Sequence, residues 1–186
     1  MKLSMDVINR VLTFWFSNNF EERRKVWFIK NADFDSEIKI KFGDEVKKAS
    51  TEVYDYLAQT PGGALAFMIL LDQFPRNIFR GDPKTFATDT KALNIAKKAI
   101  ANGLDTNLTA VQKIFFYLPF EHSENMNDQE RAVELCEALG DESYLKYAIA
   151  HRDVIERFSR FPHRNKVLGR PSTAAEIEFL KTFGSF

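Results

Sequence analysis

The sequence predicts an all-α protein of about eight or nine helices arranged as stacked antiparallel hairpins. Apolar residues recur at helical spacing along most of the chain, no segment resembles a strand with a partner, and several helix-capping patterns occur between the stripes. The length of 186 residues suits a single helical domain, residues 1–186. Stacked hairpins also indicate a tetratricopeptide-like right-handed superhelix, although the repeat of roughly 34 residues typical of such arrays is not visible.

The first half of the chain contains four helical patterns. A first stripe is formed by Val7, Ile8, Val11, Leu12 and Trp15, and a second by Phe34, Ile38, Phe42, Val46, Ala49 and Val53. Pro61-Gly62-Gly63 is expected to break the second helix. Residues 64–74 are apolar all round and rich in Ala and Leu, which favours a buried central helix. A fourth helix, Asp89 to Asn102, should stop at Asn102-Gly103.

The second half contains three patterns typical of a capping box, in which the first and fourth residues bond each other's N–H groups. They are Thr109-x-x-Gln112, Asn127-x-x-Glu130 and Thr173-x-x-Glu176. Gly140 should end the helix that follows the second pattern. That helix carries Cys136 on its apolar stripe, which indicates an inert buried thiol and not a nucleophile.

Composition restricts the function and the location. The 26 basic and 26 acidic side chains cancel, which argues against broad binding to nucleic acid or to a membrane surface. One cysteine cannot form an internal disulfide, no signal peptide is visible, and no apolar run approaches the length of a membrane span. We therefore expect a cytoplasmic protein. The charge is unevenly spread, since residues 121–142 have eight acids against one arginine and residues 151–170 have six bases against two acids.

Three times an apolar element meets proline beside polar residues. The motifs are Phe74-Pro75-Arg76-Asn77, Leu118-Pro119-Phe120-Glu121-His122 and Phe161-Pro162-His163-Arg164-Asn165. Because proline disfavours helix in the residue before it, Phe74 and Phe161 should be extended and anchored in the core. The arginines then offer planar five-donor forks. The same residues would equally serve as helix caps and Asx turns, and both interpretations stay open.

A helix over Glu142–Phe158 places His151 on one stripe with Tyr144, Tyr147, Ala148, Ile155 and Phe158. Such a histidine is either a satisfied core residue or an acid–base group near neutral pH. The candidate catalytic residues are His151, His122, Glu121 and Asp72, and the candidate ligand-binding residues are Arg76, Asn77, Arg160, His163, Arg164 and Asn165. We expect both arginine turns to face one cavity beside His151. Metal-ligand spacings, Walker loops and dinucleotide fingerprints are absent, so no metal or cofactor is expected.

Three functions remain open on these residues. An enzyme would use His151 or His122 as acid or base, Glu121 or Asp72 to orient it, and Arg76 and Arg164 to hold an anionic metabolite. A tetratricopeptide-like binding module would instead clamp a peptide carboxylate on a concave helical surface. In the third case every motif residue is a cap or an internal ion pair. The sequence does not indicate an oligomeric state.

Three segments together resemble the bacterial family catalogued as domain of unknown function 924. They are LDQFPRNIFRG, FFYLPFEHSE and HRDVIERFSRFPHRNKVLGRPST, and the aromatic LTFWF and VWF segments near the N-terminus fit as well. The resemblance runs from about Val7 to Phe183 and implies a tetratricopeptide-like all-α fold, but no activity and no catalytic residues. The family usually has glycine where this chain has Ser159, which implies a strained serine if that position needs a positive φ.

Overall fold

The computed structural model describes the backbone of residues 2–183, and over this range it contains nine α-helices and no β-strand. The all-α prediction is therefore confirmed. The described residues form two compact units, one made of residues up to 80 together with 84–119, the other of 81–83 together with residues from 120 onward. The single domain and the tetratricopeptide-like superhelix stay predictions. No helix of the described part is long and apolar enough to cross a membrane.

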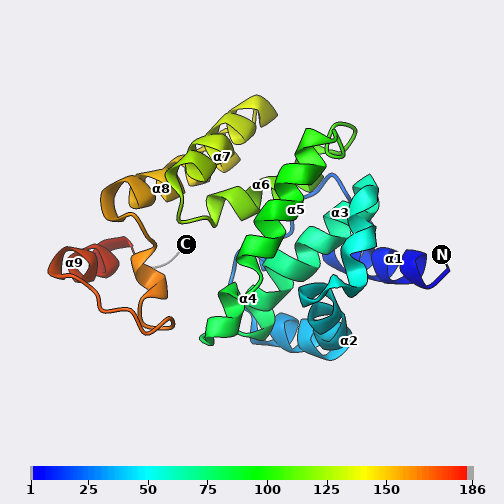
Figure 1. Ribbon diagram of the computed structural model, residues 1–186, viewed down its shortest axis with the longest axis horizontal. Coiled ribbons are helices and arrows are strands. Elements are labelled where there is room, and N and C mark those ends of the chain that lie inside the picture. Colours follow the sequence, from blue (N-terminus) through cyan, green and yellow to red (C-terminus); the bar gives the residue numbers. More distant parts are fainter. Residues whose placement is uncertain (1, 184–186) are drawn as a thin grey trace. The chain divides into compact units, whose positions relative to one another are not determined.

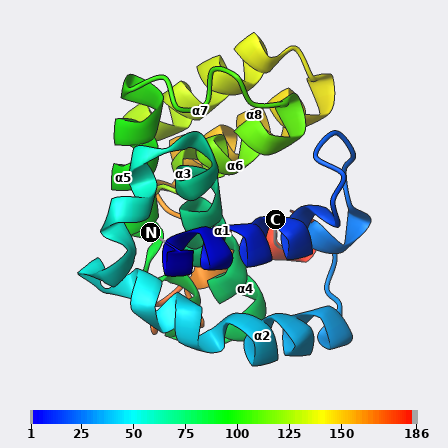
Figure 2. The same cartoon turned by 90° about the vertical axis from the view of Figure 1, so that its right-hand side faces the viewer.

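The first unit contains five helices and most of a sixth (Figure 1). They are α1 (Lys2–Phe16), α2 (Ala32–Ser50), α3 (Pro61–Met68), α4 (Phe74–Ile78), α5 (Asp89–Ala101) and α6 (Ala110–Glu121). The unit also contains 3-10 helices at Lys25–Trp27 and Glu52–Gln59 and all but the first residue of one at Pro83–Phe86. Within this unit α3 packs against α1 and α5, and α2 packs against α4 (Figure 2). The predicted first, central and fourth helices are all present.

Aromatic rings fill the core of the first unit. The Trp15 ring lies 5.6 Å from Trp27, 5.5 Å from Phe74 and 5.7 Å from Phe115, measured between centroids. All four side chains are buried, and their stacked or edge-to-face geometries are the favoured ones for aromatic pairs. Because the rings come from separate segments, they join parts of the chain that are far apart in sequence.

Two helix boundaries correct the sequence prediction. α2 ends at Ser50, so Val53 leaves the apolar stripe and lies in the following 3-10 helix with 57% of its surface exposed. Pro61-Gly62-Gly63 does not break a helix but forms the first turn of α3. The side chain of Thr60 caps this turn by accepting the N–H of Gly63, and the fixed φ of proline suits the first helical position.

The central helix continues through Pro75, so the prediction that the Phe-Pro pair ends it is wrong. A π-helical segment, Ile69–Gln73, joins α3 to α4, and Phe74 has helical dihedral angles of φ −59° and ψ −37°. The N–H of Phe74 bonds to the carbonyl of Ile69, five residues earlier. This wider turn makes room for the proline ring, which in a regular α-helix clashes with the carbonyl four residues before it.

Pro119 also lies inside a helix, contrary to the expectation that it ends one, since α6 continues to Glu121. The start of α6 agrees with the prediction. Gln112 N–H bonds to Thr109 Oγ1 at 3.3 Å, and Thr109 N–H bonds to Gln112 Oε1 at 3.0 Å, which is a capping box. Glu121 is therefore held by the last turn of a helix and not by a loop after proline.

The second unit contains the end of α6, α7 (Met126–Leu139), α8 (Glu142–Phe158), α9 (Ala174–Phe183) and a 3-10 helix at Pro162–Arg164. α7 and α8 lie side by side. The cap of α7 corrects the prediction, because Asn125 and not Asn127 is the N-cap. Asn125 has extended dihedral angles, and its side chain accepts the N–H of Asn127 at 2.9 Å. Gly140 ends α7 with φ +75°, as predicted.

α8 has the bounds that the sequence predicts, but its buried face differs at two positions. Tyr144 and His151 are buried as expected, whereas Tyr147 is 59% exposed and Val154 is buried instead. The buried face is thus shifted toward Val154, and Tyr147 contributes its backbone carbonyl to the interior, not its ring.

The end of α8 matches the prediction in its backbone. Ser159 has φ +57° and ψ +13°, and its N–H bonds to the carbonyl of Ile155 at 2.8 Å. Phe161 is extended, with φ −88° and ψ 109°, and fully buried. At the start of α9 the predicted capping box is present, with Glu176 N–H bonded to Thr173 Oγ1 and Thr173 N–H bonded to Glu176 Oε2.

Candidate functional site

The candidate residues fall in both units. Asp72, Arg76 and Asn77 belong to the first unit, and the second unit holds Glu121, His122, His151, Arg160, His163, Arg164 and Asn165. The expected meeting of the two arginine turns in one cavity therefore stays a prediction. Each set is described within its own unit.

In the first unit Arg76 is bound by two carboxylates. Its Nη2 lies 3.0 Å from Asp72 Oδ1 and 3.0 Å from Asp89 Oδ1, and Gln73 Nε2 donates to the other oxygen of Asp72 at 2.6 Å. Burial lowers the pKa of Arg76, but the two carboxylates outweigh this effect and the pKa lies above its ordinary value. The sequence left the partner of Asp72 open. Because the helix continues through Pro75, Arg76 lies one turn after Asp72 and is that partner.

Asn77 and the nearby Arg80 share an acid as well. Asn77 Nδ2 donates to Asp35 Oδ1 at 2.7 Å, and Arg80 approaches both oxygens of Asp35 at 3.0 and 3.1 Å. Asp35 lies in the first turn of α2. The polar residues of the first Phe-Pro motif thus tie α4 and the residues after it to other helices of their unit, which is the role of internal ion pairs.

In the second unit a glutamate and a histidine meet in a buried position. Glu121 Oε2, at the end of α6, lies 3.5 Å from Nδ1 of His151 on α8. Both side chains are almost fully buried. The same Nδ1 lies 2.8 Å from the carbonyl oxygen of Tyr147, one turn earlier. A carbonyl oxygen can only accept, so Nδ1 carries the hydrogen and the lone pair of the neutral ring is on Nε2.

Two residues of α7 fix the position of Glu121. Gln129, fully buried, donates its Nε2 to the carbonyls of Glu121 and Ser123, each at 2.6 Å, and so caps the end of α6. Cys136 lies with its Sγ 3.6 Å from Glu121 Oε1. Burial, followed by the charge of Glu121, raises the pKa of the Cys136 thiol, which agrees with the prediction of an inert thiol.

All three histidines of the sequence lie in the second unit, and we call them the histidine cluster: His122, His151 and His163. The rings of His122 and His151 are 6.3 Å apart between centroids. The Phe161 ring lies 5.7 Å from His151 and 5.6 Å from His163. Phe161 is therefore the apolar contact between His151 and His163, and His122 joins the group through His151.

Arg164 places its charge against the same phenyl ring. The guanidinium carbon of Arg164 lies 4.5 Å from the Phe161 ring centroid, within the range of a cation–π contact, and the side chain is buried. Phe161 thus has an arginine on its face and two histidines around it. The sequence named His151, His163 and Arg164 as candidates, together with Asp72 and Arg76, which belong to the first unit.

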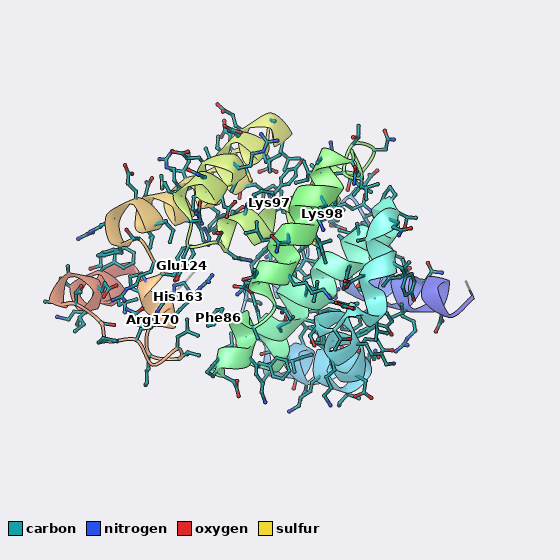
Figure 3. All side chains as sticks on the ribbon, in the orientation of Figure 1. Phe86, Lys97, Lys98, Glu124, His163 and Arg170 are labelled. Atoms are coloured by element: carbon teal, nitrogen blue, oxygen red, sulfur yellow. The ribbon has the colours of Figure 1, made fainter. Side chains whose placement is uncertain are left out.

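Glu124 and Arg170 hold the loop that carries these groups (Figure 3), and neither residue was among the sequence candidates. Arg170 binds both carboxylate oxygens of Glu124 at 2.7 and 2.9 Å and donates to the Phe161 carbonyl at 3.1 Å. Glu124 accepts the Phe161 N–H at 2.8 Å. Burial raises the pKa of Glu124, but these bonds and the charges of Arg170 and Arg164 outweigh it and lower that pKa. The motif GRPST contains Arg170, and this was the available signal.

Asn165 and Arg160 have internal partners. Asn165 donates to Ser172 Oγ at 3.1 Å and accepts from Arg170 Nε at 2.9 Å. Arg160 binds Glu176 through two bonds of 2.6 and 2.9 Å and donates to the carbonyl of Pro171. For Asn165 and Arg160 the contacts match the cap-and-turn interpretation that the sequence left open.

In the second unit, the histidine cluster with Glu121 and Arg164 combines the groups that acid–base chemistry and anion binding require. Among the residues whose placement is described, no three His, Cys, Asp or Glu side chains converge so that they could hold a metal ion. The arrangement can exchange protons through an imidazole oriented by a carboxylate, and it places a positive charge close by.

Two comparisons place this chain among known proteins. A family model described as "Bacterial protein of unknown function (DUF924)" matches residues 11–184. The solved structure of a protein of unknown function, ATU0120 from Agrobacterium tumefaciens, is 39% identical, covers 97% of both chains and has a TM-score of 0.86. No curated protein matches the chain significantly.

Proposed function

The chain belongs to the DUF924 family of bacterial proteins, and we propose that its second unit binds a small anionic ligand beside the histidine cluster, with His151 as the acid–base group. The observation that carries this proposal is the distance of 3.5 Å between Glu121 Oε2 and His151 Nδ1. A carboxylate beside an imidazole fixes the tautomer and stabilises the imidazolium that forms when the ring takes up a proton.

The tautomer of His151 supports a role for Nε2 as the base. With its hydrogen on Nδ1, a neutral His151 presents the Nε2 lone pair, which accepts a proton from a bound reactant or water. Glu121 and the Tyr147 carbonyl both lie at Nδ1, so they orient the ring from the side opposite Nε2. Glu121 and Gln129 are positioning residues in this proposal, because they act through His151 or through the end of α6.

Arg164 and His163 are the proposed anion-binding groups. A guanidinium on the face of a phenyl ring is partly desolvated, which strengthens its attraction for a carboxylate or phosphate. The ligand would be a carboxylate or phosphate metabolite. The peptide-binding alternative needs an open concave array, and it stays a prediction from the sequence.

The test is a thermal-shift screen of phosphates and carboxylates on the intact protein. Anion binding should raise the melting temperature with concentration by mass action. Arg164→Gln and His163→Gln should remove the ligand-induced shift, and Arg152→Gln is the matched control because Arg152 pairs with Asp153 on the surface of α8. The shift, and not the melting temperature itself, is compared, since Arg164 is buried and its replacement changes stability.

A second readout separates binding from acid–base chemistry. The ring signals of the three histidines are followed by NMR during titration with the stabilising anion. Binding should move the signals of His163 and His151, and Glu121→Gln should change the response of His151 but keep the anion bound. An anion that stabilises the Arg164→Gln variant as strongly as the wild type would place the site elsewhere.

A further inference from the structure

The second unit contains an open cleft away from the histidine cluster. It lies where α8 ends and α9 begins, has a volume of about 540 Å³, and is lined by Arg157, Phe158, Ser159, Arg160, Thr173 and Glu176, with Ala175. This size is in the range of small-molecule sites.

Arg157 is the feature of the cleft that requires an explanation. Its guanidinium carbon lies 4.7 Å from the Phe158 ring centroid and 5.8 Å from that of Phe179. Within the described part of the chain no carboxylate pairs with Arg157, whereas Arg152 on the same helix binds Asp153. Arg157 is exposed, and its contacts with the two rings orient the guanidinium along the cleft.

The other charges of the cleft neutralise each other. Arg160 forms two bonds with Glu176, and Glu176 also accepts the N–H of Thr173. The lining thus has two arginines against one glutamate and keeps one net positive charge, at Arg157. Phe158 and Ala175 add apolar surface, and Ser159 and Thr173 add hydroxyl groups.

We infer that this cleft binds a carboxylate attached to an apolar group, with the carboxylate on Arg157 and the apolar group against Phe158 and Ala175. Arg157 presents the planar fork that binds a carboxylate through two parallel hydrogen bonds. An apolar group next to the anion gains from the rings, which a small inorganic ion does not. The site is independent of the histidine cluster, and each can fail without the other.

The experiment is calorimetric titration of the intact protein with benzoate, acetate and inorganic phosphate as probes. Benzoate should bind more tightly than acetate or phosphate. Arg157→Gln should weaken benzoate binding by about tenfold or more, the loss expected for a charge-assisted pair. Ala175→Leu, at an exposed position that lines the cleft, should weaken it by filling the space. Arg152→Gln removes the same charge from α8 outside the cleft and should leave the affinity unchanged.

Each remaining outcome overturns the inference. If no probe binds the wild type at millimolar concentration, or if Arg157→Gln binds benzoate as well as the wild type, the cleft is not a carboxylate site. If acetate binds as tightly as benzoate, the cleft does not recognise the apolar group of the ligand, and that part of the inference is wrong. Benzoate binding that Arg164→Gln abolishes and Arg157→Gln leaves intact would assign the anion to the histidine cluster. Thermal melts of Arg157→Gln and Arg164→Gln show whether these two variants fold.

Discussion

Thr88 donates its hydroxyl hydrogen to the carbonyl oxygen of Leu71 at 2.6 Å, in the buried interior of the first unit. Leu71 is four residues before Pro75, so in an α-helix its carbonyl would pair with the N–H that proline lacks. A side chain from outside the helix thus satisfies the acceptor that proline leaves open. This contact and the π-helical turn together explain why a helix passes through a Phe-Pro pair.

Replacing Thr88 with valine should destabilise the protein by about 1–3 kcal/mol, because a buried carbonyl loses its partner while the shape of the side chain is kept. Urea denaturation measures the loss. Thr13→Val, at an exposed position of α1, is the control and should change the free energy of unfolding by less than about 0.5 kcal/mol.

A second substitution tests the connection to proline. Pro75→Ala restores an N–H four residues after Leu71, so the cost of Thr88→Val should be smaller in that background. An equal cost in both backgrounds would show that Thr88 does not compensate for Pro75.

Replacing Ser159 with glycine should make the protein more stable. Its φ of +57° lies in the left-handed region, which costs an L-residue roughly 1–2 kcal/mol, and the greater freedom of glycine in the unfolded chain offsets part of the gain. Ser159→Gly should therefore raise the free energy of unfolding by about 0.5–1 kcal/mol in denaturant titration. Ser36→Gly, at an exposed position inside α2, should lower it by about 0.5 kcal/mol. A loss of stability in Ser159→Gly would mean that the serine side chain stabilises the turn.

Local patterns predicted the fold well where neighbouring residues decide it. The capping boxes at Thr109 and Thr173 and the glycine at 140 depend on contacts within a few residues, and all three are present. The prediction was wrong at Phe74, because the room for Pro75 comes from a π-helical turn and the partner of Leu71 from Thr88, thirteen residues beyond the proline. Local preference cannot report such a contact.

The sequence named several residues of the candidate site but not the distant residues that hold them in place. Histidine and arginine in unusual surroundings identified His151, His163 and Arg164, which lie together around Phe161. Glu124 and Arg170, which hold this loop, look like ordinary charged residues in the sequence. They are 46 positions apart in the chain, and only the fold brings them together as a pair. Conversely, Arg76 fitted the pattern of a ligand-binding arginine, yet its carboxylate partners are internal.

Phe74 and Phe161 should each be essential to the core of their own unit. Both are fully buried, and Phe74 packs 4.9 Å from Phe42 between ring centroids. Truncation to alanine should lower the free energy of unfolding by about 3–5 kcal/mol through lost contacts and a cavity. Phe28→Ala, at a position that is 56% exposed, should cost less than about 1 kcal/mol. A cost that small at Phe74 or Phe161 would contradict their role as anchors.

The ion pair between Arg160 and Glu176 should make stability depend on acid pH. The two bonds from Arg160, with the N–H of Thr173, lower the pKa of Glu176 from 4.5 to about 2. A carboxyl whose pKa is lowered by folding stabilises the protein fully above the unfolded value, so this contribution should be present above about pH 4.5 and disappear as the pH falls toward 2. Urea denaturation between pH 6 and 2.5, at about half-unit steps, should show a shallower decline for Glu176→Gln than for the wild type. Glu178→Gln, whose partner Lys181 lies on the surface, should follow the wild-type curve. Identical curves for wild type and Glu176→Gln would show that the pair does not contribute to folding.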